Sequence, residues 1–269
     1  MANGDDRFSG AIPESYDKLM VPLLFAPWAE VLADRVAALA PADILETAAG
    51  TGVLTRALSK RCPAATITAT DLNAEMLEVA RRRVANGLVR FLPADALDLP
   101  FGDAAFDLAV SQFGMMFYPD RARGFAESWR LLRPGGTMFA AIWAPLADNP
   151  VSEAVAVAVA KCLTGNPPGF FARVPFSYHD PDVIRADACA GGFDAVEIDR
   201  VTLAHPPVAA DSAVEALCLG TPMRAEIESH GPEAMARVLA AAKGAMAAVS
   251  DERGRVAATM TALIVTARR

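Results

Sequence analysis

The feature that most constrains the fold is an alternation of short apolar runs and longer amphipathic segments between residues 40 and 145. Alternation of this kind is typical of strand–helix–strand units, in which crossover helices connect parallel strands. It predicts an α/β fold, with a doubly wound, mostly parallel seven-stranded sheet and helices on both faces. The expected core strands are 44–46, 65–70, 89–92, 106–111 and 137–143, and the expected helices are 53–60, 74–85 and 120–132.

The chain carries no low-complexity linker, so we expect residues 1–269 to form a single domain. Pro134-Gly135-Gly136 is expected to end the helix before it, and Asn149 to cap a helix that begins at Pro150. The expected parts are a helical cap at 1–40, a ligand-binding core at 41–145, lid or substrate segments at 146–192 and 204–255, and C-terminal strands of the core sheet at 193–203 and 256–269.

Charge and composition limit the partners. With 25 Lys plus Arg against 32 Asp plus Glu, the formal net charge is −7, which disfavours nucleic acid and anionic membranes. The N-terminus is polar and acidic and no apolar run is long enough for a membrane span, so we expect a cytoplasmic protein. Nothing in the pattern specifies an oligomeric state. Four scattered cysteines predict free thiols: Cys62, Cys162, Cys189 and Cys218.

The stretch ILETAAGTGVLT, residues 44–55, connects the first expected strand to the first expected helix. Gly50 and Gly52 permit positive φ and remove Cβ atoms that would hold a ligand away. The helix that follows presents free N–H groups and the positive end of its dipole. A phosphate or a carboxylate suits such a loop, and close packing without a ligand is the alternative interpretation.

Asp71 narrows the choice of ligand. It ends the second expected strand, 19 residues after Gly52, where an acid can accept hydrogen bonds from both ribose hydroxyls. Two features argue against a nicotinamide dinucleotide. The third glycine of its fingerprint is Thr55 here, and a second acid, Asp95, follows the third expected strand, where it could accept from an exocyclic amine such as that of adenine.

These segments together resemble the class I S-adenosylmethionine-dependent methyltransferases, particularly the small-molecule branch with the ubiquinone and menaquinone C-methyltransferases. The resemblance spans roughly residues 41–145, which would form a Rossmann-like cofactor-binding core. It rests on four motifs in order: ILETAAGTG, ITATDLNAEML, FLPADALDLPFGDAAFDLAVSQFGMMF and WRLLRPGGTM.

The resemblance implies S-adenosyl-L-methionine as cofactor and S-adenosyl-L-homocysteine as product. It assigns the methionyl end to the loop after the first strand, the ribose to Asp71 and the adenine to the segments that follow. An N-terminal tyrosine closes over the cofactor in relatives. The implied cofactor-binding residues are Tyr16, Glu46, Ala48, Gly50, Gly52, Asp71, Leu72, Met76, Asp95, Ala96, Ser111 and Gln112.

The chain departs from the family pattern at two of these positions. Ala48 replaces the usual first glycine and Glu46 the usual aspartate. An alanine methyl fits at position 48 if the backbone there keeps negative φ. We therefore expect the two departures to reduce the affinity for the cofactor without changing the assignment.

Methyl transfer from a sulfonium is an in-line displacement that needs alignment more than acid–base groups, so a general base is optional. Candidate bases are Tyr178 and His179, and an apolar acceptor pocket could be lined by Phe170, Phe171 and Phe176, although ordinary packing explains these residues equally well. His179, His205 and His230 lack metal-ligand spacing, so no metal is expected.

The sequence therefore predicts an S-adenosylmethionine-dependent methyltransferase of a small, apolar or aromatic acceptor. One alternative is an NAD(P)-dependent Rossmann oxidoreductase. The other is a non-catalytic S-adenosylmethionine-binding regulatory module, which would keep the nucleoside pocket and lose access for an acceptor.

Overall fold

A computed structural model describes residues 14, 16–163 and 167–269. The described residues form two compact units, which we call the sheet unit and the helical unit. The sheet unit contains Trp28–Trp143, Tyr178–Val201 and Ala262–Arg269, and the helical unit contains the described residues up to Pro27 together with Ala144–Ser177 and Thr202–Thr261. Parts of the predicted cap at 1–40 and of the predicted lid at 146–192 lie outside the described residues, and the single-domain assignment stays a prediction.

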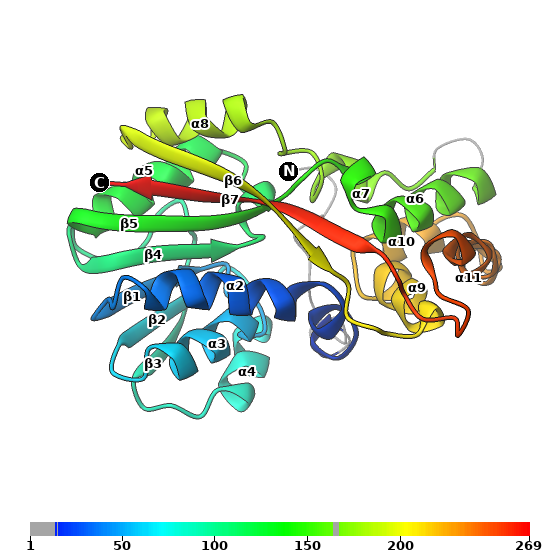
Figure 1. Cartoon of the computed structure of the whole chain (residues 1–269), viewed down its shortest axis with the longest axis horizontal. Coiled ribbons are helices and arrows are strands. Elements are labelled where there is room, and N and C mark those ends of the chain that lie inside the picture. The colour runs from blue at the N-terminus through cyan, green and yellow to red at the C-terminus, as the bar shows by residue number, and fades with distance from the viewer. Residues whose placement is uncertain (1–13, 15, 164–166) are drawn as a thin grey trace. The chain divides into compact units, whose positions relative to one another are not determined.

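The sheet has seven strands in the order β3-β2-β1-β4-β5-β7-β6 (Figure 1). The neighbouring pairs from β3 to β5 are parallel, and β7 runs antiparallel to β5. The order reverses between β1 and β4, which is where a doubly wound sheet opens a crevice at its carboxyl edge. The strands are β1 Asp43–Thr47, β2 Thr66–Asp71, β3 Val89–Pro93, β4 Phe106–Gln112, β5 Leu132–Trp143, β6 Ala195–Ala204 and β7 Thr259–Arg268.

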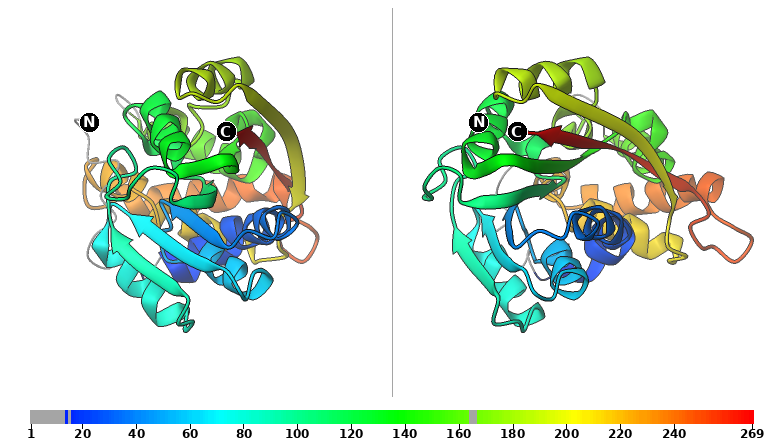
Figure 2. Two further views of the ribbon diagram at one scale, coloured as in Figure 1. Left: turned by 90° about the vertical axis from the view of Figure 1, so that its left-hand side faces the viewer. Right: turned by 60° about the vertical axis from the view of Figure 1, so that its left-hand side comes forward.

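The predicted fold class is confirmed. The central strands are apolar along their length because helices cover both faces of the sheet: Ile44, Leu45, Leu108 and Val110 are almost completely buried. Helices α2, α3 and α4 lie on one face, and α5 and α8 lie on the other (Figures 1 and 2). Their bounds are α2 Ala26–Ala37, α3 Val53–Arg61, α4 Ala74–Arg83, α5 Arg121–Leu131 and α8 Pro181–Ala190.

The turn Pro134-Gly135-Gly136 corrects one expectation. It does not separate α5 from the fifth strand, because β5 already begins at Leu132, which pairs with Phe106 ahead of a shift in register. Gly135 adopts a φ of 83°, and its N–H donates to the carbonyl of Arg269 at 2.8 Å. The C-terminal residue thus supplies the backbone partner that keeps this stretch in the sheet.

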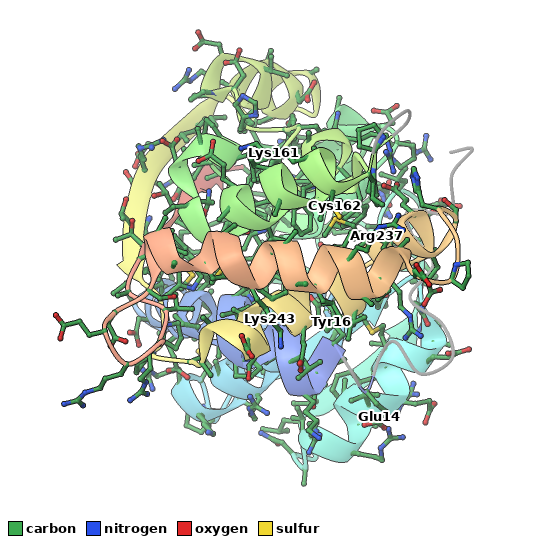
Figure 3. All side chains as sticks on the ribbon, turned by 90° about the vertical axis from the view of Figure 1, so that its right-hand side faces the viewer. Glu14, Tyr16, Lys161, Cys162, Arg237 and Lys243 are labelled. Atoms are coloured by element: carbon green, nitrogen blue, oxygen red, sulfur yellow. The ribbon has the colours of Figure 1, made fainter. Side chains whose placement is uncertain are left out.

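The helical unit consists largely of short helices. Two prolines lie within the N-terminal helices, Pro22 in η1 and Pro27 in the first turn of α2. Figure 3 shows α6 and α11 side by side, with Lys161 and Cys162 on α6 and Arg237 and Lys243 on α11. The helices of this unit are η1 Tyr16–Phe25, η3 Leu146–Asp148, α6 Pro150–Cys162, α7 Phe170–Arg173, α9 Ala210–Leu219, α10 Met223–Glu228, α11 Ala234–Ala245 and η4 Met246–Val249.

None of the helices in the described part of the chain combines the length and apolarity that crossing a membrane would require.

Asn149 also corrects an expectation. It precedes α6, but its side chain makes no capping hydrogen bond to that helix. Its Oδ1 accepts from the N–H of Thr261 at 3.0 Å, and its Nδ2 donates to the carbonyls of Thr261 and Pro145, each at 3.2 Å. The buried amide therefore joins the start of α6 to strand β7, because a long-range backbone edge satisfies more of its donors and acceptors than a cap would.

Asn149→Ala is expected to lower the free energy of unfolding by about 1–3 kcal/mol, because it leaves the buried backbone N–H of Thr261 without a partner. Urea denaturation followed by circular dichroism measures the change. Asn86→Ala is the control, since Asn86 accepts a single local bond from Leu88, and its cost should stay under about 1 kcal/mol. Equal costs for the two variants would contradict the role assigned to Asn149.

Candidate functional site

The loop after β1 is held in left-handed backbone conformations. Ala48, Gly50 and Gly52 have φ values of 53°, 56° and 79°. The condition under which an alanine was expected to fit, a negative φ at position 48, is therefore not met. Ala48 adopts a conformation that costs an L-residue roughly 1 kcal/mol relative to glycine.

Gly114 explains how the Ala48 methyl is accommodated. A Cβ atom built on Gly114, just beyond β4, would lie 2.3 Å from the Cβ of Ala48 and 3.0 Å from the Oγ of Ser111. The methyl at position 48 thus fills the volume that the missing side chain at position 114 leaves open. The two loops on either side of the strand-order reversal fit together through this pair.

The two glycines of the loop have different surroundings. A Cβ on Gly50 would meet nothing within 4 Å, whereas a Cβ on Gly52 would lie 2.9 Å from the Cβ of Ala80 in α4. Gly52 therefore allows close packing against α4, and Gly50 leaves its surroundings open. Between them, Thr51 is buried, and its Oγ1 has no hydrogen-bond partner in the described part of the chain.

Asp71 anchors this loop. Its Oδ2 accepts from the N–H of Gly50 at 2.8 Å, and its Oδ1 accepts from the N–H of Asn73 at 2.8 Å. Asn73 in turn caps α4 by accepting from the N–H of Glu75 at 2.8 Å. Burial raises the pKa of Asp71, while the two backbone bonds oppose the rise. Each carboxylate oxygen keeps acceptor capacity beyond these bonds.

Glu46 lies one strand away, near the end of β1. Its side chain is 1% exposed, and its Oε2 accepts from the Thr55 hydroxyl at 2.6 Å. Burial raises the pKa of Glu46 to about 8, with a smaller contribution from the negative charge of Asp71. An acid with this pKa binds a proton at neutral pH and releases it readily when a cation approaches.

The segment expected to hold the adenine follows β2 and β3. Leu72 is 65% exposed beside Asp71, whereas Met76 is buried on the inner side of α4. The Oδ1 of Asp95 accepts from the N–H of Leu97 at 2.9 Å, which folds the exposed acid and Ala96 into a tight turn. Leu72 and Asp95 are therefore accessible to a ligand, and Met76 supports the helix beneath them.

Helix α5 fixes the rest of this segment. Arg123 donates to the carbonyl of Leu97 at 2.7 Å, and Arg130 donates to the carbonyl of Phe101 at 2.7 Å. Glu127 accepts from Arg130 at 2.8 Å and from the N–H of Leu99 at 3.0 Å. No local sequence signal marks the contacts of this helix with Leu97, Leu99 and Phe101, because they join residues about thirty positions apart.

A cluster of hydroxyl groups lies between the ends of β1 and β4. Ser111 is buried, and its hydroxyl donates to the carbonyl of Thr47 at 3.4 Å. Tyr118, which sequence reasoning missed, donates its hydroxyl to Thr47 Oγ1 at 3.2 Å. Burial raises the pKa of Tyr118, and the charges of Asp71 and Asp95 also act on it. Gln112 ends β4 beside the cluster and is half-buried.

The remaining predicted cofactor and substrate residues belong to the helical unit. Tyr16 stacks on Phe25 with 5.2 Å between ring centroids. Three buried rings, Phe170, Phe171 and Phe176, form a contiguous aromatic cluster with centroid distances of 5.9 and 6.2 Å. The roles expected for these four residues stay predictions.

A single acid fixes the start of this aromatic cluster. Glu226 of α10 accepts from the N–H groups of Gly169 and Phe170, at 2.9 and 3.2 Å, and from Arg173 at 2.5 Å. The short helix α7 is thereby fixed to α10.

The two candidate bases lie in the sheet unit. Tyr178 is 2% exposed, and its hydroxyl donates to Asp187 at 2.8 Å. Burial and the adjacent Asp187 carboxylate raise the pKa of Tyr178 well above its usual value, which opposes a role as base. His179 is half-buried beside it. Neither residue gains geometric support as a catalytic group, and both assignments stay predictions.

Metal-ligand groups and disulfides are both absent from the described residues: no cluster of three or more His, Cys, Asp or Glu side chains could hold a metal ion, and the four cysteines are free thiols.

Comparison with known proteins identifies the family. A model described as a methyltransferase domain matches residues 45–140. A demethylmenaquinone methyltransferase of Clavibacter sepedonicus is 32% identical over 185 residues, which cover 65% of this chain and 75% of that protein. The chain belongs to the class I S-adenosylmethionine-dependent methyltransferase family. The matched residues include all four motifs on which the sequence resemblance rests except Ile44, the first residue of the first motif, so that resemblance is confirmed.

Further likenesses agree with this family. A demethylmenaquinone methyltransferase of Thermus thermophilus is 41% identical over 136 residues, 49% of this chain. The match spans 61% of that relative, less than two thirds of its length. The crystal structure of the YcgJ protein from Bacillus subtilis has a TM-score of 0.60 at 18% identity, and the match covers 90% of this chain and 98% of that chain, which shows a shared fold.

Gly114→Ala is expected to lower the free energy of unfolding by about 1–3 kcal/mol, because its Cβ overlaps the Ala48 methyl. Ala48→Gly removes both the overlap and the left-handed alanine, so in that background Gly114→Ala should cost at least about 1 kcal/mol less. Denaturant titration of the two single variants and the double variant measures this coupling. Gly87→Ala, with nothing within 4 Å, is the control. Additive costs would show that the two loops do not fit together as described.

Glu46→Gln should change how stability depends on pH. The folded pKa of about 8 lies above the unfolded value near 4.5, so the folded wild type binds a proton that the unfolded chain has lost. Its stability should therefore fall relative to Glu46→Gln as pH rises from 5 to 8, by on the order of 2–4 kcal/mol. Urea unfolding at both pH values tests this, and a constant difference between the two proteins would contradict a neutral buried Glu46.

Proposed function

We propose that this chain transfers a methyl group from S-adenosyl-L-methionine to a small-molecule acceptor. The observation that carries the proposal is the geometry of Asp71. Its carboxylate holds the N–H of Gly50 at 2.8 Å, beside an exposed Leu72, and keeps acceptor capacity on both oxygens. A ribose diol presents two donors that suit such a carboxylate, next to a loop whose Gly50 leaves open space.

The residues present fit the cofactor. The buried Thr51 hydroxyl, which lacks a partner among the described residues, is suited to a polar ligand at the loop. Glu46 provides a carboxyl group for the cationic amine of the methionyl end, and the charged amine would favour its ionised form. Leu72 offers an apolar surface and Asp95 an acceptor for the adenine. The departures at Ala48 and Glu46 thus leave a usable site.

The cofactor, when bound, supplies a methyl group on an electrophilic sulfonium. The chain would hold the sulfonium and the acceptor in line and exclude water, and such alignment can contribute roughly 7–11 kcal/mol at most. We assign the acids that follow β1, β2 and β3, which are Glu46, Asp71 and Asp95, to the cofactor, and we assign no general base to the acceptor. Catalysis by alignment needs none.

For the acceptor we propose a small apolar or aromatic molecule of the quinone type. Relatives from Clavibacter sepedonicus and Thermus thermophilus are named as demethylmenaquinone methyltransferases. The buried rings of Phe170, Phe171 and Phe176 are suited to an apolar molecule. The net charge of −7 disfavours nucleic acid. We also propose a cytoplasmic location, because four free thiols suit a reducing compartment.

The two alternatives have less support. Thr55 occupies the position of the third glycine in the dinucleotide-binding fingerprint. It is fully buried and donates its hydroxyl to Glu46 at 2.6 Å, so a polar pair stands where a dinucleotide-binding loop would have a glycine. A non-catalytic binding module would share the Asp71 geometry. It differs from the enzyme in having no methyl-transfer activity with any acceptor.

Titration calorimetry with S-adenosyl-L-homocysteine tests the cofactor. The wild type should bind with a roughly micromolar Kd, and Asp71→Ala should weaken binding about 100-fold or more, because two charged hydrogen bonds and the Gly50 anchor are lost. Asp182→Ala removes an exposed acid at the start of α8 and should leave the Kd unchanged. Circular dichroism checks that each variant is folded.

NADH is the second ligand in the same titration. Binding of NADH by folded wild type that does not bind S-adenosyl-L-homocysteine would refute the methyltransferase proposal in favour of the oxidoreductase. Binding of S-adenosyl-L-homocysteine without transfer of labelled methyl to a short-chain demethylmenaquinol or to a panel of small phenols would favour the binding module.

A further inference from the structure

Arg121 is held without an acidic partner. It is the first residue of α5, and its guanidinium carbon lies 4.5 Å from the ring centroid of Tyr178. One of its terminal nitrogens donates to the carbonyl of Met116 at 3.3 Å. Its Nε is buried without a hydrogen-bond partner, and no carboxylate of the described residues pairs with it. In a chain with 32 acids, this arginine carries an uncompensated charge.

Other arginines of the sheet unit show the contrast. Arg130 pairs with Glu127 and Asp103, both at 2.8 Å, and Arg133 pairs with Asp43 at 2.9 Å. Arg121 instead lies at the start of α5, where the helix dipole repels a cation. Its buried Nε–H adds a desolvation cost that a hydrogen bond would remove. An anionic ligand at the terminal nitrogens of the guanidinium would offset the repulsion by the helix dipole.

The neighbours of Arg121 fix the position of its charge. The ring of Tyr178 is buried, and its hydroxyl donates to Asp187 of α8 at 2.8 Å, so the surface beneath the guanidinium is rigid. Met116 belongs to the short helix η2 (Met115–Phe117) that follows β4. Arg121 therefore lies beyond the carboxyl end of β4, at the edge of the sheet where doubly wound folds bind ligands.

We propose that Arg121 recognises an anionic oxygen of the methyl acceptor, a carboxylate, phenolate or enolate oxygen. The proposal rests on the methyltransferase function proposed above and specifies its substrate class: the acceptor binds as an anion. A cation within about 4–6 Å lowers the pKa of a hydroxyl by roughly 1–3 units. A phenolic or enolic acceptor would then release its proton to solvent as it binds and need no general base, which agrees with the buried, hydrogen-bonded state of Tyr178.

A pair of nearly isosteric probes tests the charge preference: 2-naphthoate and its neutral analogue 2-naphthamide, titrated calorimetrically into the full chain with and without S-adenosyl-L-homocysteine. The wild type should bind the carboxylate about 10- to 100-fold more tightly than the amide. Arg121→Gln should abolish this preference, and Arg121→Lys should keep part of it. Arg185→Gln, which removes an exposed arginine of α8 paired with Asp182, should keep all of it.

Several outcomes would overturn the proposal: equal affinity for acid and amide in the wild type, no binding of either probe, or a preference that survives in Arg121→Gln. A purely structural Arg121 would instead show as a lower melting temperature of Arg121→Gln with the acid preference retained. Binding of S-adenosyl-L-homocysteine is read separately. If the wild type did not bind S-adenosyl-L-homocysteine, the methyltransferase function would be refuted. The preference for 2-naphthoate over 2-naphthamide would still test the role of Arg121.

Discussion

The hydrogen bond from the Gly50 N–H to the Asp71 carboxylate is the contact on which the site depends. It joins the loop after β1 to the end of β2 and holds the loop while Ala48, Gly50 and Gly52 adopt left-handed conformations. The same carboxylate accepts from Asn73, which caps α4, so a single side chain sets the loop and the start of the next helix. A half-buried acid loses part of its hydration on folding, and the two backbone hydrogen bonds offset part of that cost.

Two non-glycine residues with left-handed backbone conformations lie where the strand order reverses, after β1 and β4. Ala48 is a left-handed alanine, and Phe113, after β4, has a φ of 54°. Phe113 is fixed by stacking on Trp143 with 3.9 Å between centroids, and Ala48 is fixed by the space at Gly114. Conformations of this kind persist where the surrounding structure determines them, and they concentrate at ligand sites. Their position between β1 and β4 agrees with the family to which the chain belongs.

Helix α5 holds the loop between β3 and β4 in place at the sheet. Its Arg123, Glu127 and Arg130 hold the loop between β3 and β4 through bonds to backbone groups. Its first residue, Arg121, is left with a single carbonyl and an aromatic face. One helix thus carries arginines whose hydrogen bonds fix the loop between β3 and β4, and one, Arg121, for which we propose a role in binding the acceptor. The difference arises from where each side chain meets the sheet.

The sequence by itself determined the fold class, the approximate positions of the core strands and the glycine-containing loop after the first strand. Short apolar runs and glycines act over a few positions, so the place of Asp71 at the end of the second strand could be predicted from local chemistry alone. Only the tertiary structure decided the sign of φ at Ala48, the long-range role of Asn149, the place of Tyr118 among the hydroxyls and the unpaired charge of Arg121. Each of these depends on which distant backbone or side chain arrives beside the residue, and spacing along the chain carries no record of that.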